Sequence, residues 1–138
     1  LATAAASAAA LSLRVQPKMS VAVFGATGLT GRECTHQLLE RGVPVRALCR
    51  DPSKLLTPLG STGKEELVEN DQLYKYKGSV TDAADVEKVF EGGDVEGVII
   101  SLGGKTKDVG PPMLTDGTAT VIAAICVESN FRRPTPST

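Results

Sequence analysis

The chain has 138 residues, enough for one domain with a single hydrophobic core. Its 15 lysine and arginine residues nearly balance 16 aspartate and glutamate residues, and the formal net charge of −1 gives no basic field for nucleic acid. One histidine and three widely spaced cysteines fit neither a metal site nor a disulfide framework. We therefore expect no metal and no nucleic-acid partner, with Cys34, Cys49 and Cys126 as reduced packing residues of an intracellular protein.

The first 18 residues are rich in alanine and serine, contain Arg14 and Lys18, and include no acidic residue. This composition is similar to the end of an organellar transit peptide from a plastid or mitochondrial protein. The alternative is upstream sequence before a start at Met19, because MSVAVFGATG would make a natural N-terminus for a cytoplasmic protein. In either case we expect a leader over 1–18 and a folded domain over 19–138, with no membrane span.

Strand and helix patterns alternate from Ser20 onward. A short apolar run predicts a buried strand over 20–24, and the spacing of Leu29, Cys34, Leu38 and Leu39 predicts a helix over 28–41 that ends at Gly42. The later patterns predict strands over 43–49, 73–77 and 97–101, with a loop over 57–72. They also predict two helices. The first is capped by Thr81 and has Val86, Val89 and Phe90 on its apolar face, and the second covers 115–128.

This alternation predicts an α/β fold, a Rossmann-type doubly wound parallel sheet in the strand order 3-2-1-4 with apolar strands covered on both faces. The sequence stops after the fourth strand and its helix, so we expect a C-terminally incomplete domain with a truncated sheet. The outer edge of the fourth strand would then have unpaired backbone groups on an apolar run, which predicts self-association through that edge.

The stretch GATGLTG, residues 25–31, stands where the first strand gives way to the first helix. Glycines at such a turn let the backbone approach a pyrophosphate, whose charge rests on the N-terminus of the helix. Gly25 fits the tight turn, Gly28 the close approach of a phosphate, and Gly31 the packing of helix on strand. Small or polar groups and backbone N–H donors around the anion would come from Thr27, Leu29 and Thr30. The spacing is GxxGxxG and not the common GxGxxG, and a turn that merely ends a strand is the alternative.

The end of the second predicted strand indicates which dinucleotide the domain prefers. Arg50 stands 19 positions after Gly31, and Lys54 follows one helical turn later. An acidic residue at this place binds a ribose 2′-hydroxyl, whereas a cation suits a 2′-phosphate. The two cations favour NADP(H), although Asp51 lies between them; Asp51-Pro52 is typical of the cap of a following turn. A solvated strand-end charge is the alternative role for Arg50.

The motifs GATGLTG, ALCRDPSKL, GSVTDAADVEKVF, VIISLGGKTKD and DGTATVIAA follow one another between about Val21 and Val127. In motif and spacing the chain resembles the atypical short-chain dehydrogenase/reductases of the NmrA-like group, most closely the flavin reductases of the biliverdin reductase B type. The resemblance implies a Rossmann fold, NADP(H) as cofactor, and hydride transfer to a flavin, quinone or tetrapyrrole-like acceptor.

The same resemblance assigns cofactor contacts by position. The pyrophosphate contacts would be Gly25, Thr27, Gly28, Leu29 and Thr30, and the 2′-phosphate contacts Arg50 and Lys54. The adenine would be lined by Gly78, Ser79 and Val80, and the nicotinamide would lie near Leu102 and Gly103. Lys105 and Lys107 follow, and either could attract an anionic substrate or be a plain exposed lysine.

The chain departs from the family pattern in two places. The family has Gly-Asp-Val at the adenine where this chain has Gly-Ser-Val, so a carboxylate acceptor is lost at Ser79. The family continues into a fifth strand with serines beside the nicotinamide, and Ser137 and Thr138 cannot be given that role by position. The catalytic residues are therefore unknown. Two hypotheses stay open: an NADPH-dependent oxidoreductase, and a regulatory module of NmrA type that binds NADP without turnover.

Overall fold

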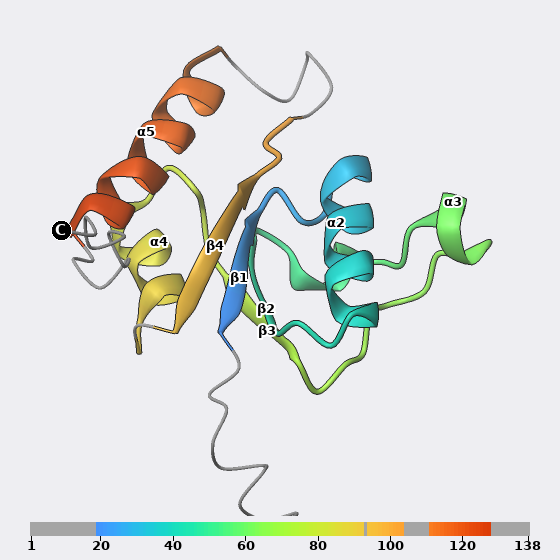
Figure 1. The fold of residues 1–138 in the computed structure, drawn as a ribbon. Coiled ribbons are helices and arrows are strands. Elements are labelled where there is room, and N and C mark those ends of the chain that lie inside the picture. The colour runs from blue at the N-terminus through green and yellow to red at the C-terminus, as the bar shows by residue number, and fades with distance from the viewer. Residues whose placement is uncertain (1–18, 93, 104–110, 128–138) are drawn as a thin grey trace, which may run out of the picture.

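The computed structural model describes residues 19–92, 94–103 and 111–127. One parallel sheet has the strand order β3-β2-β1-β4, and its strands are β1 (Ser20–Phe24), β2 (Val45–Cys49), β3 (Leu73–Lys77) and β4 (Val95–Ile100). The longer helices are α2 (Leu29–Glu40), α4 (Ala83–Phe90) and α5 (Pro111–Val127), and two short ones are η1 (Pro52–Lys54) and α3 (Leu59–Thr62). Helix α2 covers one face of the sheet, and α4 and α5 cover the other (Figure 1). The predicted Rossmann-type fold and strand order are confirmed.

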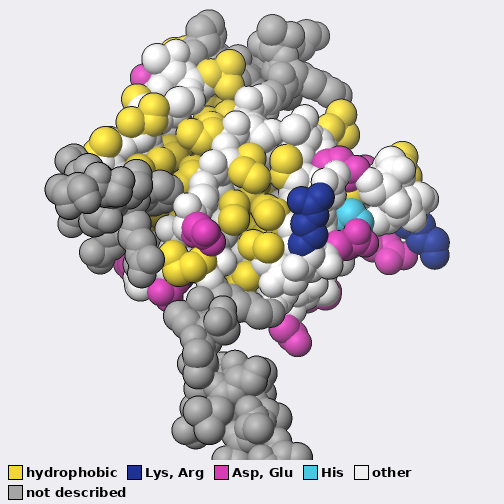
Figure 2. Space-filling model, viewed as in Figure 1, with side chains coloured by type: hydrophobic (Ala, Val, Ile, Leu, Met, Phe, Trp, Pro, Cys, Tyr) yellow, Lys and Arg dark blue, Asp and Glu magenta, His cyan; other side chains and the backbone are white. Residues whose placement is uncertain are grey.

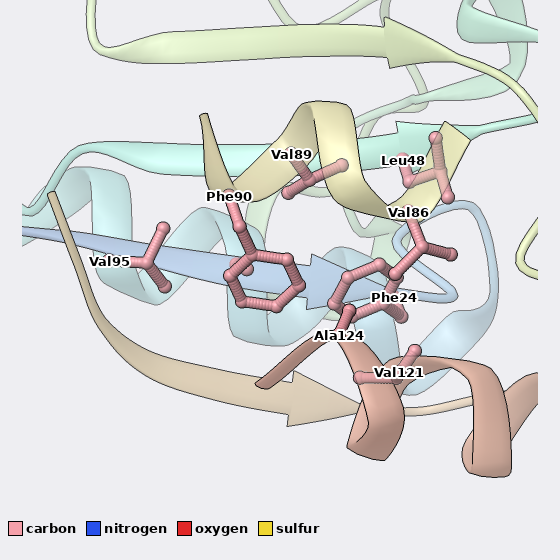
Figure 3. Packing of buried hydrophobic residues seen from close by; sticks show 9 residues of the cluster. Phe24, Leu48, Val86, Val89, Phe90, Val95, Val121 and Ala124 are labelled. Carbon is pink, nitrogen blue, oxygen red and sulfur yellow. The ribbon is translucent and has the colours of Figure 1, made fainter. Parts of the chain in front are cut away.

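Alternate side chains of β1 point to opposite faces and divide the core in two. Ala22 and Phe24 pack with residues of α4 and α5, whereas Val23 packs in a second cluster on the α2 face. Figure 3 shows the first cluster, where the rings of Phe24 and Phe90 stack with their centroids 6.0 Å apart. The two clusters pack the helices against both faces of the sheet. This packing fixes the positions of the strand ends relative to the helix ends.

The outer strands are less buried than the sequence predicted. We expected strands that are apolar and covered on both faces, but no residue of β3 is fully buried and Tyr74 is 52% exposed. Strand β4 pairs with β1 alone among the described residues, and Ile100 is 38% exposed. The expectation fails for β3 and β4 because they are the outer strands of the described sheet, where a strand has a neighbouring strand on one side only.

Several boundaries differ from the predicted ones. Asp82, not Thr81, is the N-cap of α4, because its carboxylate accepts a hydrogen bond from the N–H of Ala84 at 3.0 Å. Strand β4 begins at Val95, where a register irregularity lets it pair with Ser20. Helix α5 begins at Pro111 and not at residue 115, since proline is tolerated in the first turn of a helix.

The predicted loop over 57–72 contains the short helix α3 and an isolated antiparallel bridge between Leu56 and Leu67. All three cysteines are free thiols, as predicted, but only Cys49 is buried. The packing role predicted for Cys126 is wrong, since this residue is exposed on α5. Within the described ranges, no helix combines the length and apolarity needed to cross a bilayer.

Candidate functional site

A cleft of about 360 Å³ lies at the carboxyl ends of the strands. Its walls come from the β1–α2 turn, the end of β2, the β3–α4 loop, the end of β4 and the first turn of α5. The lining residues are Phe24, Gly25, Thr27, Gly28, Leu48, Cys49, Arg50, Gly78, Ser79, Val80, Thr81, Leu102, Gly103 and Met113. Strand order reverses between β1 and β4, and open α/β sheets bind ligands at such a switch point.

Two glycines of the β1–α2 turn are required by the protein itself. Gly25 has φ +89°, and a Cβ there would lie 2.1 Å from the carbonyl oxygen of Ser101. A Cβ on Gly31 would lie 2.0 Å from the carbonyl oxygen of Gly25. Both distances are far below a van der Waals contact. Glycine at position 25 therefore lets the turn approach the residue after β4, and glycine at position 31 lets α2 pack on the turn.

Gly28 is different because no contact with the described residues requires glycine there. It is exposed, its φ is −75°, and a Cβ would lie 3.4 Å from the carbonyl oxygen of Gly25, an ordinary contact. Gly28 is also the N-cap of α2, and no described side chain caps this helix. The N–H groups of Leu29 and Thr30 in the first turn therefore face outward with the positive end of the helix dipole. The open space and the N–H groups fit an anion such as a pyrophosphate.

Arg32 holds this turn in place, a role that the sequence did not reveal. Its Nε donates to the carbonyl oxygen of Thr27 at 2.9 Å, and its Nη1 donates to Glu65 Oε1 at 2.7 Å. The guanidinium is largely buried, with the side chain 15% exposed. Arg32 therefore joins the glycine turn to the segment after α3, a contact between residues 33 positions apart.

At the end of β2, the exposed Arg50 lines the cleft and Asp51 does not. Asp51 is the N-cap of η1, and its Oδ1 accepts hydrogen bonds from Ser53 N at 3.0 Å and Ser53 Oγ at 2.5 Å. These hydrogen bonds, together with the nearby Lys54 and Lys77, lower the pKa of Asp51, so its carboxylate is ionised at neutral pH. The predicted capping role of Asp51 is confirmed.

The β3–α4 loop forms the next wall of the cleft through Gly78, Ser79, Val80 and Thr81. The hydroxyl groups of Ser79 and Thr81 lie 2.8 Å apart in a hydrogen bond, and Ser79 Oγ also accepts from the N–H of Thr81 at 3.3 Å. Ser79 thus lines the predicted adenine position, but its hydroxyl is already hydrogen-bonded within the loop.

The far end of the cleft is formed by Leu102, Gly103 and Met113. Helix α5 packs closely on Val80 and Leu102 at Gly117. A Cβ on Gly117 would lie 2.9 Å from Val80 Cγ1 and 3.0 Å from Leu102 Cδ1. Beside Arg50, burial raises the pKa of the Cys49 thiol to about 11, so it is protonated at neutral pH and a poor nucleophile. Among the described residues, no three His, Cys, Asp or Glu side chains gather in a way that could hold a metal ion.

The structure brings most of the predicted site residues together on one cleft. Those that do not line it are Leu29, Thr30 and Gly31 in the first turn of α2 and Lys54 in η1. The lining residues that the sequence did not indicate are Phe24, Leu48, Cys49, Thr81 and Met113. Phe24, Leu48 and Cys49 could have been found, since they are the last residues of parallel strands. Lys105, Lys107, Ser137 and Thr138 lie outside the described residues.

A comparison with known protein families covers nearly all the residues that line the cleft. A family model described as NAD(P)H-binding matches residues 25–133 of the chain. The chain belongs to this NAD(P)H-binding family. The predicted NAD(P)-binding family is thereby confirmed, while the dehydrogenase/reductase activity and closeness to flavin reductases stay predictions.

Individual relatives of this NAD(P)H-binding chain are distant and longer. The reductase pytE of Aspergillus terreus is 34% identical over 93 residues, which cover 64% of this chain and 35% of pytE. The yeast methylglyoxal/isovaleraldehyde reductase Gre2, solved with NADPH, has a TM-score of 0.62 at 19% identity over 80% of this chain and 34% of its own.

The Bordetella bronchiseptica enzyme WbmH, solved with NAD+, has a TM-score of 0.57 at 21% identity over 80% of this chain and 35% of its own. The two solved structures show a shared fold. The chain spans about a third of the length of each of these three proteins.

Proposed function

We propose that this chain is the cofactor-binding part of an NADPH-dependent oxidoreductase that acts on a flavin, quinone or tetrapyrrole-like acceptor. One observation carries the choice of NADPH over NADH. Arg50 lines the cleft after β2, while the Asp51 carboxylate is hydrogen-bonded to Ser53 in the cap of η1. A guanidinium suits a 2′-phosphate, and an acidic side chain free to bind the ribose hydroxyls is missing from the described lining.

Each wall of the cleft has a part in this proposal. The uncapped N-terminus of α2 and Gly28 hold the pyrophosphate, and Arg50 with Lys54 holds the 2′-phosphate. The β3–α4 loop lines the adenine, and Leu102 and Gly103 lie beside the nicotinamide. When bound, NADPH supplies a hydride, which carries two electrons and one proton, and the acceptor takes a second proton from solution.

The names of the relatives support the reductase class without deciding the cofactor or the acceptor. The relative from Aspergillus terreus is named a reductase, and the two structural neighbours were solved with NADPH and with NAD+. The flavin, quinone or tetrapyrrole-like acceptor is proposed on the sequence resemblance described above.

A second candidate is a regulatory module that binds NADP and turns nothing over. One observation favours it: no His, Asp, Glu or Tyr side chain is among the described residues that line the cleft. Such side chains are the usual proton donors and acceptors of enzymes.

The first test is a calorimetric titration of the chain with NADP+ and with NAD+. We expect NADP+ to bind more tightly, and Arg50→Ala to weaken NADP+ binding about tenfold with little effect on NAD+, because one charge-assisted contact is lost. Arg41→Ala is the matched control, since Arg41 is exposed at the opposite end of α2. Equal affinity of the unchanged chain for both nucleotides would contradict the proposed preference.

Turnover separates the two candidates. NADPH oxidation is followed with a flavin and with a quinone as acceptor, under conditions in which binding has been measured. Acceptor-dependent oxidation supports the oxidoreductase, whereas tight NADP(H) binding without oxidation supports the regulatory module.

A further inference from the structure

Asp85 lies behind the cleft, in the first turn of α4, and does not line it. Its Oδ2 accepts a hydrogen bond from the N–H of Ser79 at 3.0 Å. The Asp85 side chain is 21% exposed, so its carboxylate is only partly solvated. A side chain of the helix therefore holds the backbone of the loop that forms the adenine-side wall.

The neighbouring Gly78 shows how closely the loop packs on this carboxylate. A Cβ on Gly78 would lie 2.5 Å from Asp85 Cγ and 2.6 Å from Asp85 Oδ2. Its φ is not positive, so the reason for glycine here is space and not backbone conformation. No residue with a side chain fits at position 78 while Asp85 holds its present place.

Two carboxylates at the start of α4 have separate partners. Asp82 accepts from the N–H of Ala84 and so caps the helix. Asp85 accepts from Ser79 and pairs with the exposed Lys88 at 3.5 Å. The capping of α4 thus does not depend on Asp85, which leaves its carboxylate to hold the loop.

We propose that Asp85 is a positioning residue for cofactor binding: it fixes the loop of residues 78–81 in the shape that receives the adenine half of the dinucleotide. This inference rests on the proposed function, because it takes the cleft as the site of NADP(H). In this role the Asp85 carboxylate acts on the backbone of the loop from the side away from the cleft.

The test uses the full chain, titrated with NADP+ and with 2′,5′-ADP, the adenine half of the cofactor. We expect Asp85→Ala to weaken both ligands about tenfold, because the Ser79 N–H loses its acceptor and the loop is no longer held. Asp85→Asn should bind within about twofold of the unchanged chain, because its amide oxygen can accept the same hydrogen bond. Glu87→Ala is the matched control on the exposed side of α4 and should have no effect.

Hydrogen exchange gives a readout without ligand. The amide of Ser79 should exchange faster in Asp85→Ala than in Asp85→Asn, while thermal unfolding shows that both variants remain folded. Unchanged affinity of Asp85→Ala, or equal losses in the alanine and asparagine variants, would overturn the role of Asp85. If the unchanged chain binds neither ligand, the proposed function itself fails, and this role fails with it.

Discussion

Gly28 differs from the other two glycines of the β1–α2 turn in its surroundings. Gly25 and Gly31 are fixed by contacts within the protein, since a Cβ on either would collide with backbone atoms. A Cβ on Gly28 meets nothing closer than 3.4 Å, and its backbone conformation is open to any residue. The bare backbone at this position leaves the N-terminus of α2 open, as the proposed pyrophosphate site requires.

We expect Gly28→Val to abolish nucleotide binding without unfolding the domain. The branched side chain would occupy the space in which a pyrophosphate meets the first N–H groups of the helix. Gly60→Val is the matched control, because a Cβ there has no described atom within 4 Å and no residue of α3 lines the cleft. Calorimetry and circular dichroism measure both properties. Retained binding in Gly28→Val would show that the glycine serves only the turn.

Some site residues could be predicted from the sequence because their positions follow from the topology. Arg50 comes directly after a strand, and the carboxyl ends of parallel strands meet at one edge of the sheet. Arg32, Asp85 and Met113 could not be predicted in the same way. Their roles depend on contacts across the fold, such as that between Arg32 and Glu65, and no local pattern encodes these contacts.

At the scale of elements, the apolar spacing of α2 indicated only part of its buried face. Leu39 is buried and Leu38 packs beside it, as the spacing predicted, but Leu29 is 84% exposed. The buried residues are Gly31, Thr35 and Leu39, spaced four apart. Small residues face the sheet because the helix must lie close to the β1–α2 turn, and hydrophobicity alone does not reveal that requirement.

Thr35 has a buried hydroxyl group in this closely packed face of α2. It is 1% exposed, and its hydroxyl has no hydrogen-bond partner among the described residues. Valine has nearly the same shape without the hydroxyl, so we expect Thr35→Val to raise the free energy of unfolding by about 1 kcal/mol. Urea unfolding measures the change, with the exposed Thr30→Val as the control that should show no gain. A loss of stability in Thr35→Val would mean that the hydroxyl has a partner after all.

At the scale of the whole molecule, the outer edge of β4 has no partner strand among the described residues, and apolar side chains lie beside it. Figure 2 shows hydrophobic side chains gathered over β4 and toward α5. Ile100 is 38% exposed, and Leu114 and Ile122 of α5 are 43% and 51% exposed. The N–H of Ser101 donates to Phe24, and N–H directions alternate along a strand, so those of Val98 and Ile100 point away from β1.

We expect the chain as given to self-associate through this edge, since a second copy would pair with the outward N–H and C=O groups. Ile100→Pro removes one outward N–H without disturbing the β1 ladder and should shift the chain toward monomer. Ile100→Val keeps the N–H and should associate like the unchanged chain. Size-exclusion chromatography with light scattering measures the mass. A monodisperse monomer of the unchanged chain would contradict the prediction.

The position of β1 between β2 and β4 also determines when β1 can complete its strand pairing during synthesis of the chain. β1 leaves the ribosome before β2 and β4, yet it pairs with both of them. Its contact with the start of β4 joins Ser20 to Asp94, which is made 74 residues later. Until then the nascent chain carries β1 with one side uncovered, so the pairing of β1 with both of its neighbours must wait for β4.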